Sequence, residues 1–405
     1  MDGKESWIRF QQVFGYGTIR GQKVLARLGH PDAIFGRPPA ELAELGFFTP
    51  AELRRIKDAA EGSRPEEIVA FCEDYGCAIL TPDDPEYPQR LREIYACPWV
   101  LYVLGSLEGL DEELAIAMVG TRRCTEYGER AAEAIAGELA AKGAAIVSGL
   151  ARGIDTVCHM AALKAGGRTI GVQGCGIDVA YPAENAHLRE MMVGYGGAVV
   201  SEFPPGTPPA PHHFPIRNRI ISGLSNGTVV VEGTRRSGSL ITAGHALTQN
   251  RDVFAVPGSI FSELSQGPNY LIQQGARVAD GAESVLEEYR HLIRWEPAEK
   301  ELPEAEQKSL FEEFDKSGYN VEQRPGKKRA AAKSRTPGRA VQQPLPAYLT
   351  EAQQKVFSAL EDGAVHTSDE ISEGSGLPSH TVLAALTQLE IFGLVRVHPG
   401  RRFSL

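Results

Sequence analysis

Between residues 114 and 290 the sequence alternates short apolar runs with longer stretches of helical character. The apolar runs are Leu114–Val119, Ala144–Val147, Thr169–Val172, Ala198–Val200, Thr228–Val231 and Val253–Val256. Helix-length stretches lie between most of them, for example Tyr127–Lys142, Ile154–Ala165 and Ser239–Asn250. Apolar strands separated by helices are typical of a mostly parallel sheet that is covered on both faces. The sequence therefore predicts an α/β fold with a Rossmann-like, doubly wound core, to which runs at Cys77–Leu80 and Val100–Leu104 add edge strands.

Three further segments surround this core, which we expect to occupy residues 65–295. Residues 1–64 predict a small helical domain of the SAM or helix-hairpin-helix kind, whose Gly15-Tyr16-Gly17 turn either grips phosphate or packs on another module. Residues 296–346 have an acidic front, a basic rear and no apolar period, which indicates a flexible charged linker. Residues 347–405 predict three helices and a strand pair, which is the winged-helix arrangement.

Composition limits the classes of protein that need to be considered. The 405 residues include 42 Lys and Arg against 52 Asp and Glu, a formal charge of −10 that argues weakly against a nucleic-acid partner. No long apolar run occurs and the chain begins with polar residues, so we expect neither a membrane span nor a secretory signal. The 6 cysteines form no CxxC pair. These features predict a reduced, cytoplasmic protein without a metal site or disulfide framework.

Loops rich in Gly, Ser, Thr and Arg follow the predicted strands. They are VGTRRCTEYG (119–128), VSGLARGID (147–155), GCGIDVAYPAEN (174–185), FPIRNRIISGLS (214–225) and VEGTRRSGSLITAGHA (231–246). The carboxyl ends of parallel strands bring such loops to one edge of the sheet. Gly lets a ligand approach the backbone, helix N-termini favour anions, and Arg matches phosphate oxygens. The loops therefore predict a polyphosphate or nucleic-acid site.

These loops do not fit the common nucleotide-binding or hydrolytic motifs. The run that begins at Gly174 has Val179 where a nicotinamide fingerprint needs Gly or Ala, and Gly233-Thr-Arg-Arg-Ser-Gly-Ser has Ser where a P-loop needs Lys. Ser148, Asp155 and His159 resemble a catalytic triad only in composition, and we interpret them as a helix-start acid and a packed histidine beside a loop serine. We expect no bound cofactor.

One carboxylate leaves an enzymatic alternative open. Glu232 ends a predicted strand beside Arg235 and Arg236, where it either holds these arginines or acts on a ribose, as in a nucleotide phosphoribohydrolase. The local charge favours a polyanion, because residues 217–236 contain four Arg and a single acid. Candidates for stacking on the bases of a single strand are Tyr127, Tyr181, His212, His213 and Phe214.

The order of the loop motifs resembles the DprA/Smf family, the DNA-processing proteins of natural transformation. To the loops above are added SEFPPGTPP (201–209), RDVFAVPG (251–258) and SQGPNYLIQQGA (265–276), so that the resemblance covers about residues 83–282. It implies a non-enzymatic protein that binds and protects single-stranded DNA. It also implies a homodimer formed through the Rossmann-like domain, and delivery of the strand to the RecA recombinase.

The resemblance implies individual DNA-binding residues as well. Arg122 would contact phosphate, and the loop that begins at Ser148 would hold a second phosphate. One departure is Ala186-His187, where relatives often have Lys or Arg. The full implied set is Gly120, Thr121, Arg122, Ser148, Gly149, Arg152, Gly153, Asn185, Arg217, Asn218, Arg219, Ser222, Gly223, Ser237, Gly238 and Ser239.

The winged helix has two possible partners, duplex DNA and protein. Its expected recognition helix, residues 378–390, contains no Lys or Arg, although such helices usually carry basic side chains. The wing has Arg396, Arg401 and Arg402, which suit contacts to a DNA backbone. A transcription regulator that acts through residues 347–405 is therefore a further alternative.

Overall fold

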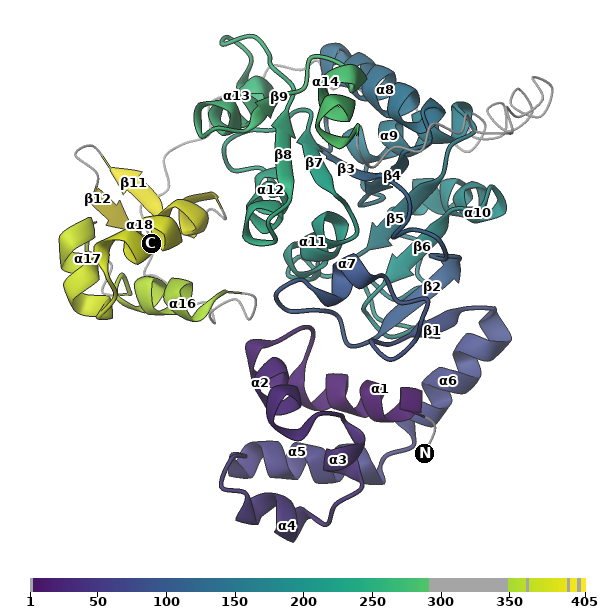
Figure 1. Cartoon of the computed structure of the whole chain (residues 1–405), viewed down its shortest axis with the longest axis vertical. Coiled ribbons are helices and arrows are strands. Elements are labelled where there is room, and N and C mark those ends of the chain that lie inside the picture. Colours follow the sequence, from purple (N-terminus) through teal and green to yellow (C-terminus); the bar gives the residue numbers. More distant parts are fainter. Residues whose placement is uncertain (1–2, 291–348, 362–363, 392–393, 399–401) are drawn as a thin grey trace, which may run out of the picture.

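A nine-stranded sheet forms the centre of the part of the chain that the computed structural model describes, residues 3–290, 349–361, 364–391, 394–398 and 402–405 (Figure 1). The strand order is β1-β2-β6-β5-β4-β3-β7-β8-β9. β2 runs antiparallel to β1 and β6, and the other pairs are parallel, which confirms the predicted sheet. The bounds are β1 Ala78–Leu80, β2 Leu101–Gly105, β3 Ala115–Val119, β4 Ala145–Ser148, β5 Thr169–Gln173, β6 Ala198–Ser201, β7 Gly227–Val230, β8 Asp252–Ala255 and β9 Arg277–Val278.

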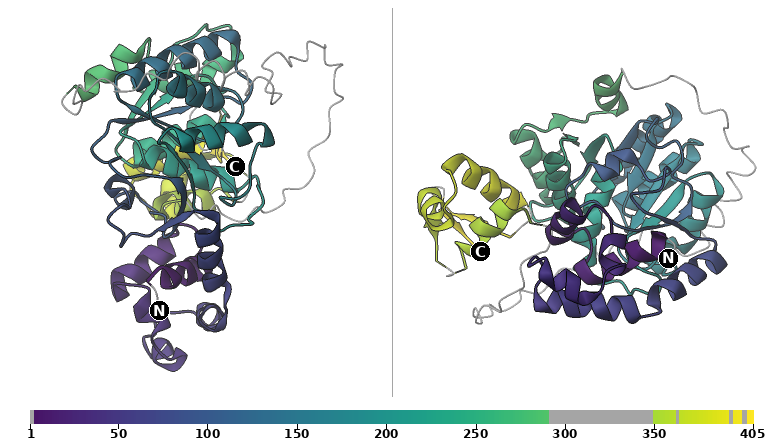
Figure 2. Two further views of the ribbon diagram at one scale, coloured as in Figure 1. Left: turned by 90° about the vertical axis from the view of Figure 1, so that its right-hand side faces the viewer. Right: turned by 60° about the horizontal axis from the view of Figure 1, so that its bottom comes forward.

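Helices cover both faces of this sheet, because the apolar side chains of each strand alternate between two layers (Figure 2). In β3, Ala115 and Ala117 lie in one apolar cluster and Ile116 and Met118 in the other. The first cluster includes α7 (Gln89–Arg92), α11 (His213–Gly223), α12 (Gly238–Thr248) and α13 (Gln266–Gln273). The second includes α8 (Glu126–Ala141), α9 (Ile154–Lys164) and α14 (Ala282–Leu286), and α10 (Ala186–Gly194) lies beside α9. Short 3₁₀ turns occur at Ala183–Asn185, Glu263–Ser265 and Glu287–Tyr289.

The direction of winding reverses next to β3. From β3 the chain adds β4, β5 and β6 on one side, and then returns to place β7, β8 and β9 on the other. In doubly wound sheets the loops after the two strands at such a reversal diverge and leave a crevice for a ligand. The loops after β3 and β7 are those that begin at Gly120 and Val231.

The N-terminal helices pack tightly on the sheet. They are α1 Gly3–Phe14, α2 Ile19–Leu28, α3 Asp32–Phe35, α4 Pro39–Glu44, α5 Pro50–Glu61 and α6 Arg64–Tyr75. Thr49 forms a capping box with Glu52 at the start of α5. Trp7 and Phe10 share one apolar cluster with Trp99 and with β2 and β6 of the sheet. The turn at Gly17 faces the core, so it is not an open phosphate grip.

The C-terminal residues form the predicted winged helix. Its helices are α16 Glu351–Ser358, α17 Ser368–Ser375 and α18 Ser379–Ile391, and its strands are β10 His366–Thr367, β11 Arg396–His398 and β12 Arg402–Ser404. The strand order β10-β12-β11 adds one strand to the expected pair. Capping boxes at Thr350 and Thr367 begin α16 and α17. The linker predicted at residues 296–346 lies outside the described residues.

Two features of the described residues bear on the expected class of protein. Among the helices in the described ranges, none has the length and apolar character that a membrane crossing requires. All of the cysteines, which lie in described parts of the chain, are free thiols.

Candidate nucleic-acid interface

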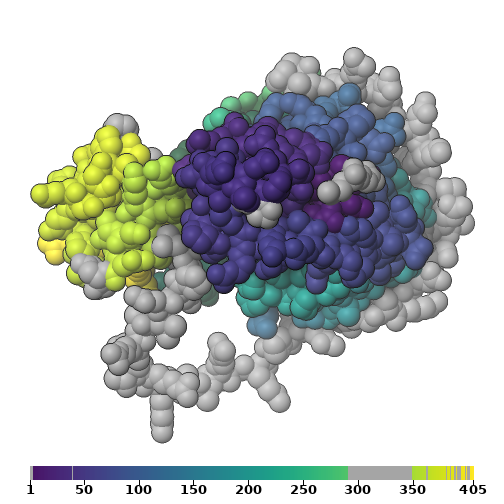
Figure 3. All heavy atoms as spheres, turned by 90° about the horizontal axis from the view of Figure 1, so that it is seen from below, coloured from purple at the N-terminus to yellow at the C-terminus, as the bar shows by residue number. Residues whose placement is uncertain are grey.

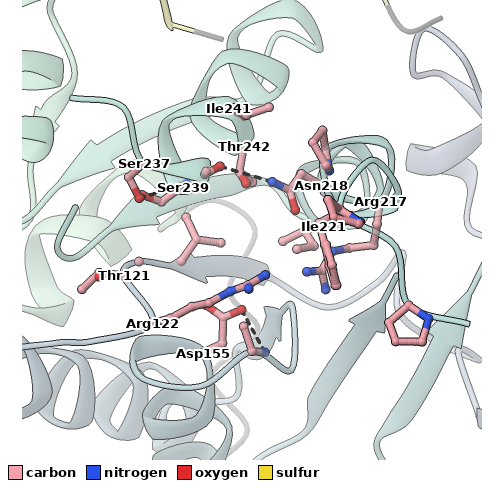
Figure 4. Close-up of a pocket in the computed structure, with 18 of the residues that line it drawn as sticks. Thr121, Arg122, Asp155, Arg217, Asn218, Ile221, Ser237, Ser239, Ile241 and Thr242 are labelled. Carbon is pink, nitrogen blue, oxygen red and sulfur yellow. Dashed lines mark hydrogen bonds between the residues drawn. The ribbon is translucent and has the colours of Figure 1, made fainter. Parts of the chain in front are cut away.

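A pocket of about 620 Å³ opens at the winding reversal, between the end of β3 and the helices α11 and α12 (Figure 4). A second pocket of about 50 Å³ adjoins it and shares Arg122, Ala151, Tyr181, Phe214 and Arg217 with it. The larger pocket is lined by Val119, Gly120, Thr121, Arg122, Ala151, Asp155, Tyr181, Pro209, Ala210, Pro211, Phe214, Pro215, Arg217, Asn218, Ile221, Ser237, Gly238, Ser239, Ile241 and Thr242.

Arg217 is a buried cation that lines both pockets. It is 4% exposed, and its Nη1 donates hydrogen bonds to the carbonyls of Gly149 and Val172. Burial lowers the pKa of Arg217 to about 10, with Asp155 opposing the shift, so the guanidinium stays protonated at neutral pH. Its Nε is buried and has no hydrogen-bond partner among the described residues. A buried cation with an unused donor is a strong attraction for an anion in the pocket.

Asp155 shapes the loop that faces Arg217. It lies at the start of α9, and its Oδ2 accepts hydrogen bonds from the backbone N–H of Gly149 at 3.2 Å and of Ala151 at 3.3 Å. Burial raises the pKa of the Asp155 carboxyl, and the charge of Arg217 opposes this. Asp155 therefore holds the loop and balances part of the charge of Arg217.

Two glycines are required for the close contacts of this loop. A Cβ atom at Gly149 would lie 2.6 Å from Nη1 of Arg217. Gly153 has a φ of +75°, and a Cβ there would collide with the carbonyl oxygen of Thr121. Any side chain at either position would push the loops after β3 and β4 apart.

Arg122 supplies the exposed cation of the site. It extends into the pocket from the loop after β3, and its Cζ lies 5.0 Å from the centroid of the Phe214 ring (Figure 4). The Phe214 ring also lies 5.7 Å from the Tyr181 ring, and the Cζ atom of Arg217 lies 5.9 Å from the centroid of the Phe214 ring. Tyr181 is 39% exposed. An exposed cation next to half-exposed aromatic rings suits a phosphate joined to a base.

The N-terminus of α12 completes the pocket wall. Ser237 is its N-cap and accepts from the backbone N–H of Ser239 at 3.4 Å. The Asn218 side chain on α11 donates to the Gly238 carbonyl at 3.2 Å, which ties the two helices together. The amide groups of this first turn favour an anion.

The structure brings ten of the sixteen predicted DNA-binding residues to the two pockets. Eight of them line the larger pocket: Gly120, Thr121, Arg122, Arg217, Asn218, Ser237, Gly238 and Ser239. The smaller pocket adds Gly149 and Arg152. Arg152 is exposed and pairs with Glu184. Outside both pockets are Ser148, Gly153, Asn185, Arg219, Ser222 and Gly223.

Most of these six residues lie behind the pocket lining and support the loops and helix that form it. The Ser148 hydroxyl donates to the Met118 carbonyl at 2.6 Å, and Asn185 donates to the Leu150 carbonyl at 2.8 Å. Ser222 and Gly223 lie on the core side of α11, where successive residues rotate away from the pocket. His187, at the departure from the family pattern, lies on α10 near Glu190 and lines neither pocket.

Arg219 is the largest fully buried side chain among the described residues, and it does not reach the pocket. Its Nη2 lies 2.6 Å from Oε1 of Glu202, its Nε donates to the Ala96 carbonyl at 2.9 Å, and its Nη1 donates to the Ile216 carbonyl at 2.9 Å. Glu202 is itself completely buried. Arg219 therefore holds α11 in place, whereas Arg217 of the same motif lines the pocket.

Residues of α1 and of the turn after it pack beside this ion pair. Gln11 on α1 donates to the Glu202 carbonyl at 3.3 Å, and the Tyr16 ring lies 4.7 Å from the Phe203 ring. A Cβ at Gly17 would collide with the Arg219 guanidinium.

The pocket also contains residues outside the predicted DNA-binding set. Pro209, Ala210 and Pro211 form an apolar wall, and Ile241 and Thr242 come from α12. Pro209 ends the motif SEFPPGTPP (201–209), and Ala210 and Pro211 follow it. Ile241 and Thr242 lie within the loop motif of residues 231–246, but the resemblance implied no role for them.

The groups considered for catalysis have structural partners. Glu232 is 1% exposed, and its two carboxylate oxygens accept from the backbone N–H of Thr125 at 2.8 Å and from the Thr125 hydroxyl at 2.6 Å. His159 is buried against Thr169, and burial lowers its pKa to about 3. The Ser148 hydroxyl bonds to a carbonyl and not to His159, as the packed interpretation predicts. In the described ranges no three His, Cys, Asp or Glu side chains are grouped to hold a metal ion.

Comparison with known proteins agrees with this geometry. Residues 78–290 match the family described as DNA recombination-mediator protein A, and residues 340–401 match the DprA winged helix domain. The chain is 34% identical to Protein Smf of Escherichia coli (strain K12) over 399 residues, which cover 98% of this chain and 94% of the relative. It is 47% identical to DNA processing protein DprA of Streptococcus pneumoniae over 290 residues, 71% of this chain and 95% of the relative.

A solved structure gives the same result for the fold. The X-ray structure of DprA from Streptococcus pneumoniae aligns with a TM-score of 0.61 and 35% identity, over 70% of this chain and 97% of that one. Family match, relatives and fold agree over the residues that carry the pocket. The chain belongs to the DprA/Smf family of DNA-processing proteins.

Proposed function

We propose that the protein binds single-stranded DNA in the pocket at the end of β3. The observation that carries this proposal is the combination of Arg122, Arg217 and the α12 N-terminus with the Phe214 ring. The two guanidinium groups and the helix amides suit a phosphate, whereas the ring offers a stacking surface for a base. A base reaches such a surface only when it is unpaired, so a single strand fits the pocket better than a duplex.

Membership of the DprA/Smf family supports a wider proposal. The protein would protect incoming single strands in the cytoplasm during natural transformation and homologous recombination, and would load RecA onto them. It would act as a homodimer through its Rossmann-like domain and without catalysis of its own. The local concentration of arginines supports DNA binding despite the formal charge of −10.

The alternative of a nucleotide phosphoribohydrolase has weaker support. Its candidate carboxylate, Glu232, lines neither pocket and caps α8 through Thr125. A role in helix capping accounts for both of its oxygens. The transcription-regulator alternative would need base contacts from α18, whose sequence lacks Lys and Arg.

The proposal is tested by titrating labelled oligo-dT and a duplex of equal length against the full chain and against Phe214→Leu. We expect tighter binding of the single strand, and a loss of about 1–3 kcal/mol in the variant because one stacked base loses its ring. Phe261→Leu is the matched control, since Phe261 is 93% exposed and lies outside both pockets. Equal affinities for the two Phe variants would contradict the proposed site.

A further inference from the structure

The winged-helix unit lies against the helix that forms one wall of the pocket. α18 packs on α12 (Figure 1), and Ile241 of α12 joins the apolar cluster of the winged helix, which includes Leu386 and Leu389. Ile241 also lines the larger pocket. One side chain therefore belongs both to the rim of the proposed DNA site and to the surface that receives the winged helix.

A second contact joins the winged helix to the N-terminal helices. Lys23 Nζ on α2 lies 4.0 Å from Glu351 Oε2 on α16, and Figure 3 shows the two units side by side. Both side chains are more than half exposed, so this ion pair contributes little to stability. Both contacts, a small apolar one and an exposed ion pair, are of a kind that a competing ligand can displace.

The chemistry of the winged helix does not suit a nucleic-acid groove. Residues 350–405 contain four Lys or Arg against seven Asp or Glu, and α18 has no Lys or Arg. A unit of this charge repels phosphate and does not extend a DNA-binding surface. Its attachment to the same chain keeps its local concentration high, so that even a weak contact is populated.

We propose that the winged-helix unit is a tethered cover that docks on α12 through α18 and competes with single-stranded DNA for the rim of the pocket. This inference rests on the proposed function of the pocket. The apparent affinity for single-stranded DNA is the intrinsic affinity multiplied by the fraction of molecules in which the cover is undocked. A cover that is docked in about 90% of molecules therefore weakens binding about tenfold. DNA binding, in turn, releases the winged helix by the same factor.

The test uses the full chain with a protease site inserted between residues 291 and 348. The affinity for oligo-dT is measured before and after cleavage, with both fragments present but diluted well below millimolar concentrations. We expect cleavage to tighten binding about tenfold. Unchanged or weaker binding after cleavage overturns the cover, whereas an absence of binding in both states overturns the proposed function itself.

Charge reversal in the uncut chain gives an independent result. Lys23→Glu places a like charge opposite Glu351, so we expect it to tighten binding of oligo-dT, and Glu351→Lys in the same chain should restore the original affinity. Lys57→Glu is the matched control, because Lys57 also lies on the N-terminal helices but pairs with Glu61. If Lys23→Glu and Lys57→Glu change the affinity equally, the effect is general electrostatics and the cover is contradicted.

Discussion

Replacing Arg219 by methionine separates a structural role for this residue from a role in DNA binding. The substitution removes the guanidinium and keeps most of the side-chain volume. In the native protein the guanidinium is buried, lies 2.6 Å from Glu202 and donates to two backbone carbonyls. A structural residue should therefore lose stability on substitution without losing a phosphate contact.

The expected loss of stability follows from the burial of the Arg219–Glu202 ion pair. Removing one partner leaves the Glu202 carboxylate uncompensated, which costs about 3–5 kcal/mol. Burial already raises the pKa of Glu202, and Arg219 opposes that rise. Without Arg219 the pKa rises further, so the folded state holds a proton that the unfolded state has released. The stability deficit should be smallest below the unfolded carboxyl pKa of about 4.3 and should grow as the pH rises through the folded pKa.

The assay combines denaturant unfolding at pH 5 and pH 8 with oligo-dT binding over a salt series. We expect a deficit that increases with pH and a salt dependence equal to that of the native protein. Adding Glu202→Gln should recover part of the stability, because a neutral amide needs no counter-charge. Full stability together with a reduced salt dependence would refute this reasoning and make Arg219 a DNA ligand.

Three further perturbations test other parts of the account. Gly153→Ala should weaken oligo-dT binding and destabilise the fold by about 1–3 kcal/mol, because Gly153 has a positive φ and a Cβ there would collide with the Thr121 carbonyl. Unchanged oligo-dT binding together with unchanged stability would contradict the required loop geometry. Glu232→Ala should lower the free energy of unfolding by about 1–3 kcal/mol by leaving the Thr125 N–H unsatisfied, and unaltered stability would reopen a catalytic role. The depressed pKa of His159, about 3, means that stability is present above the unfolded pKa of about 6.5 and is lost as the pH falls toward 3. Between pH 7 and pH 5 His159 should therefore cost the native protein about 2 kcal/mol of unfolding free energy, and His159→Asn should remove this part of the pH dependence. Denaturant unfolding at the two pH values measures it, and an unchanged pH profile in the variant would contradict the prediction.

The sequence predicted the central fold well because the core strands carry strong signals. All six apolar runs became parallel strands, and the runs near Ile79 and Tyr102 became edge strands β1 and β2. The short strand Arg277–Val278 was missed, since two exposed residues carry no period. The apolar pattern also could not predict that β2 runs antiparallel, because strand direction depends on the neighbouring strands with which β2 pairs.

Prediction of the site succeeded for loops and failed for side-chain direction. Convergence at one sheet edge follows from parallel strands, so Arg122 and Ser237 were placed together correctly. Arg217 and Arg219 look equivalent in sequence, yet a rotation of the helix by two residues turns one toward the pocket and the other toward Glu202. That partner lies on a distant segment, which no local motif reveals. Net charge was equally uninformative, because the position of a few arginines matters more than their number.

The most direct test of the central claim is the salt dependence of oligo-dT binding for Arg122→Ala and Arg123→Ala. Both residues are exposed neighbours, but only Arg122 lines the pocket. If Arg122 contacts one phosphate of a single strand, its loss should reduce the slope of log affinity against log salt by about 0.7, while Arg123→Ala leaves the slope unchanged. Equal slopes for the native protein and Arg122→Ala would contradict DNA binding in this pocket.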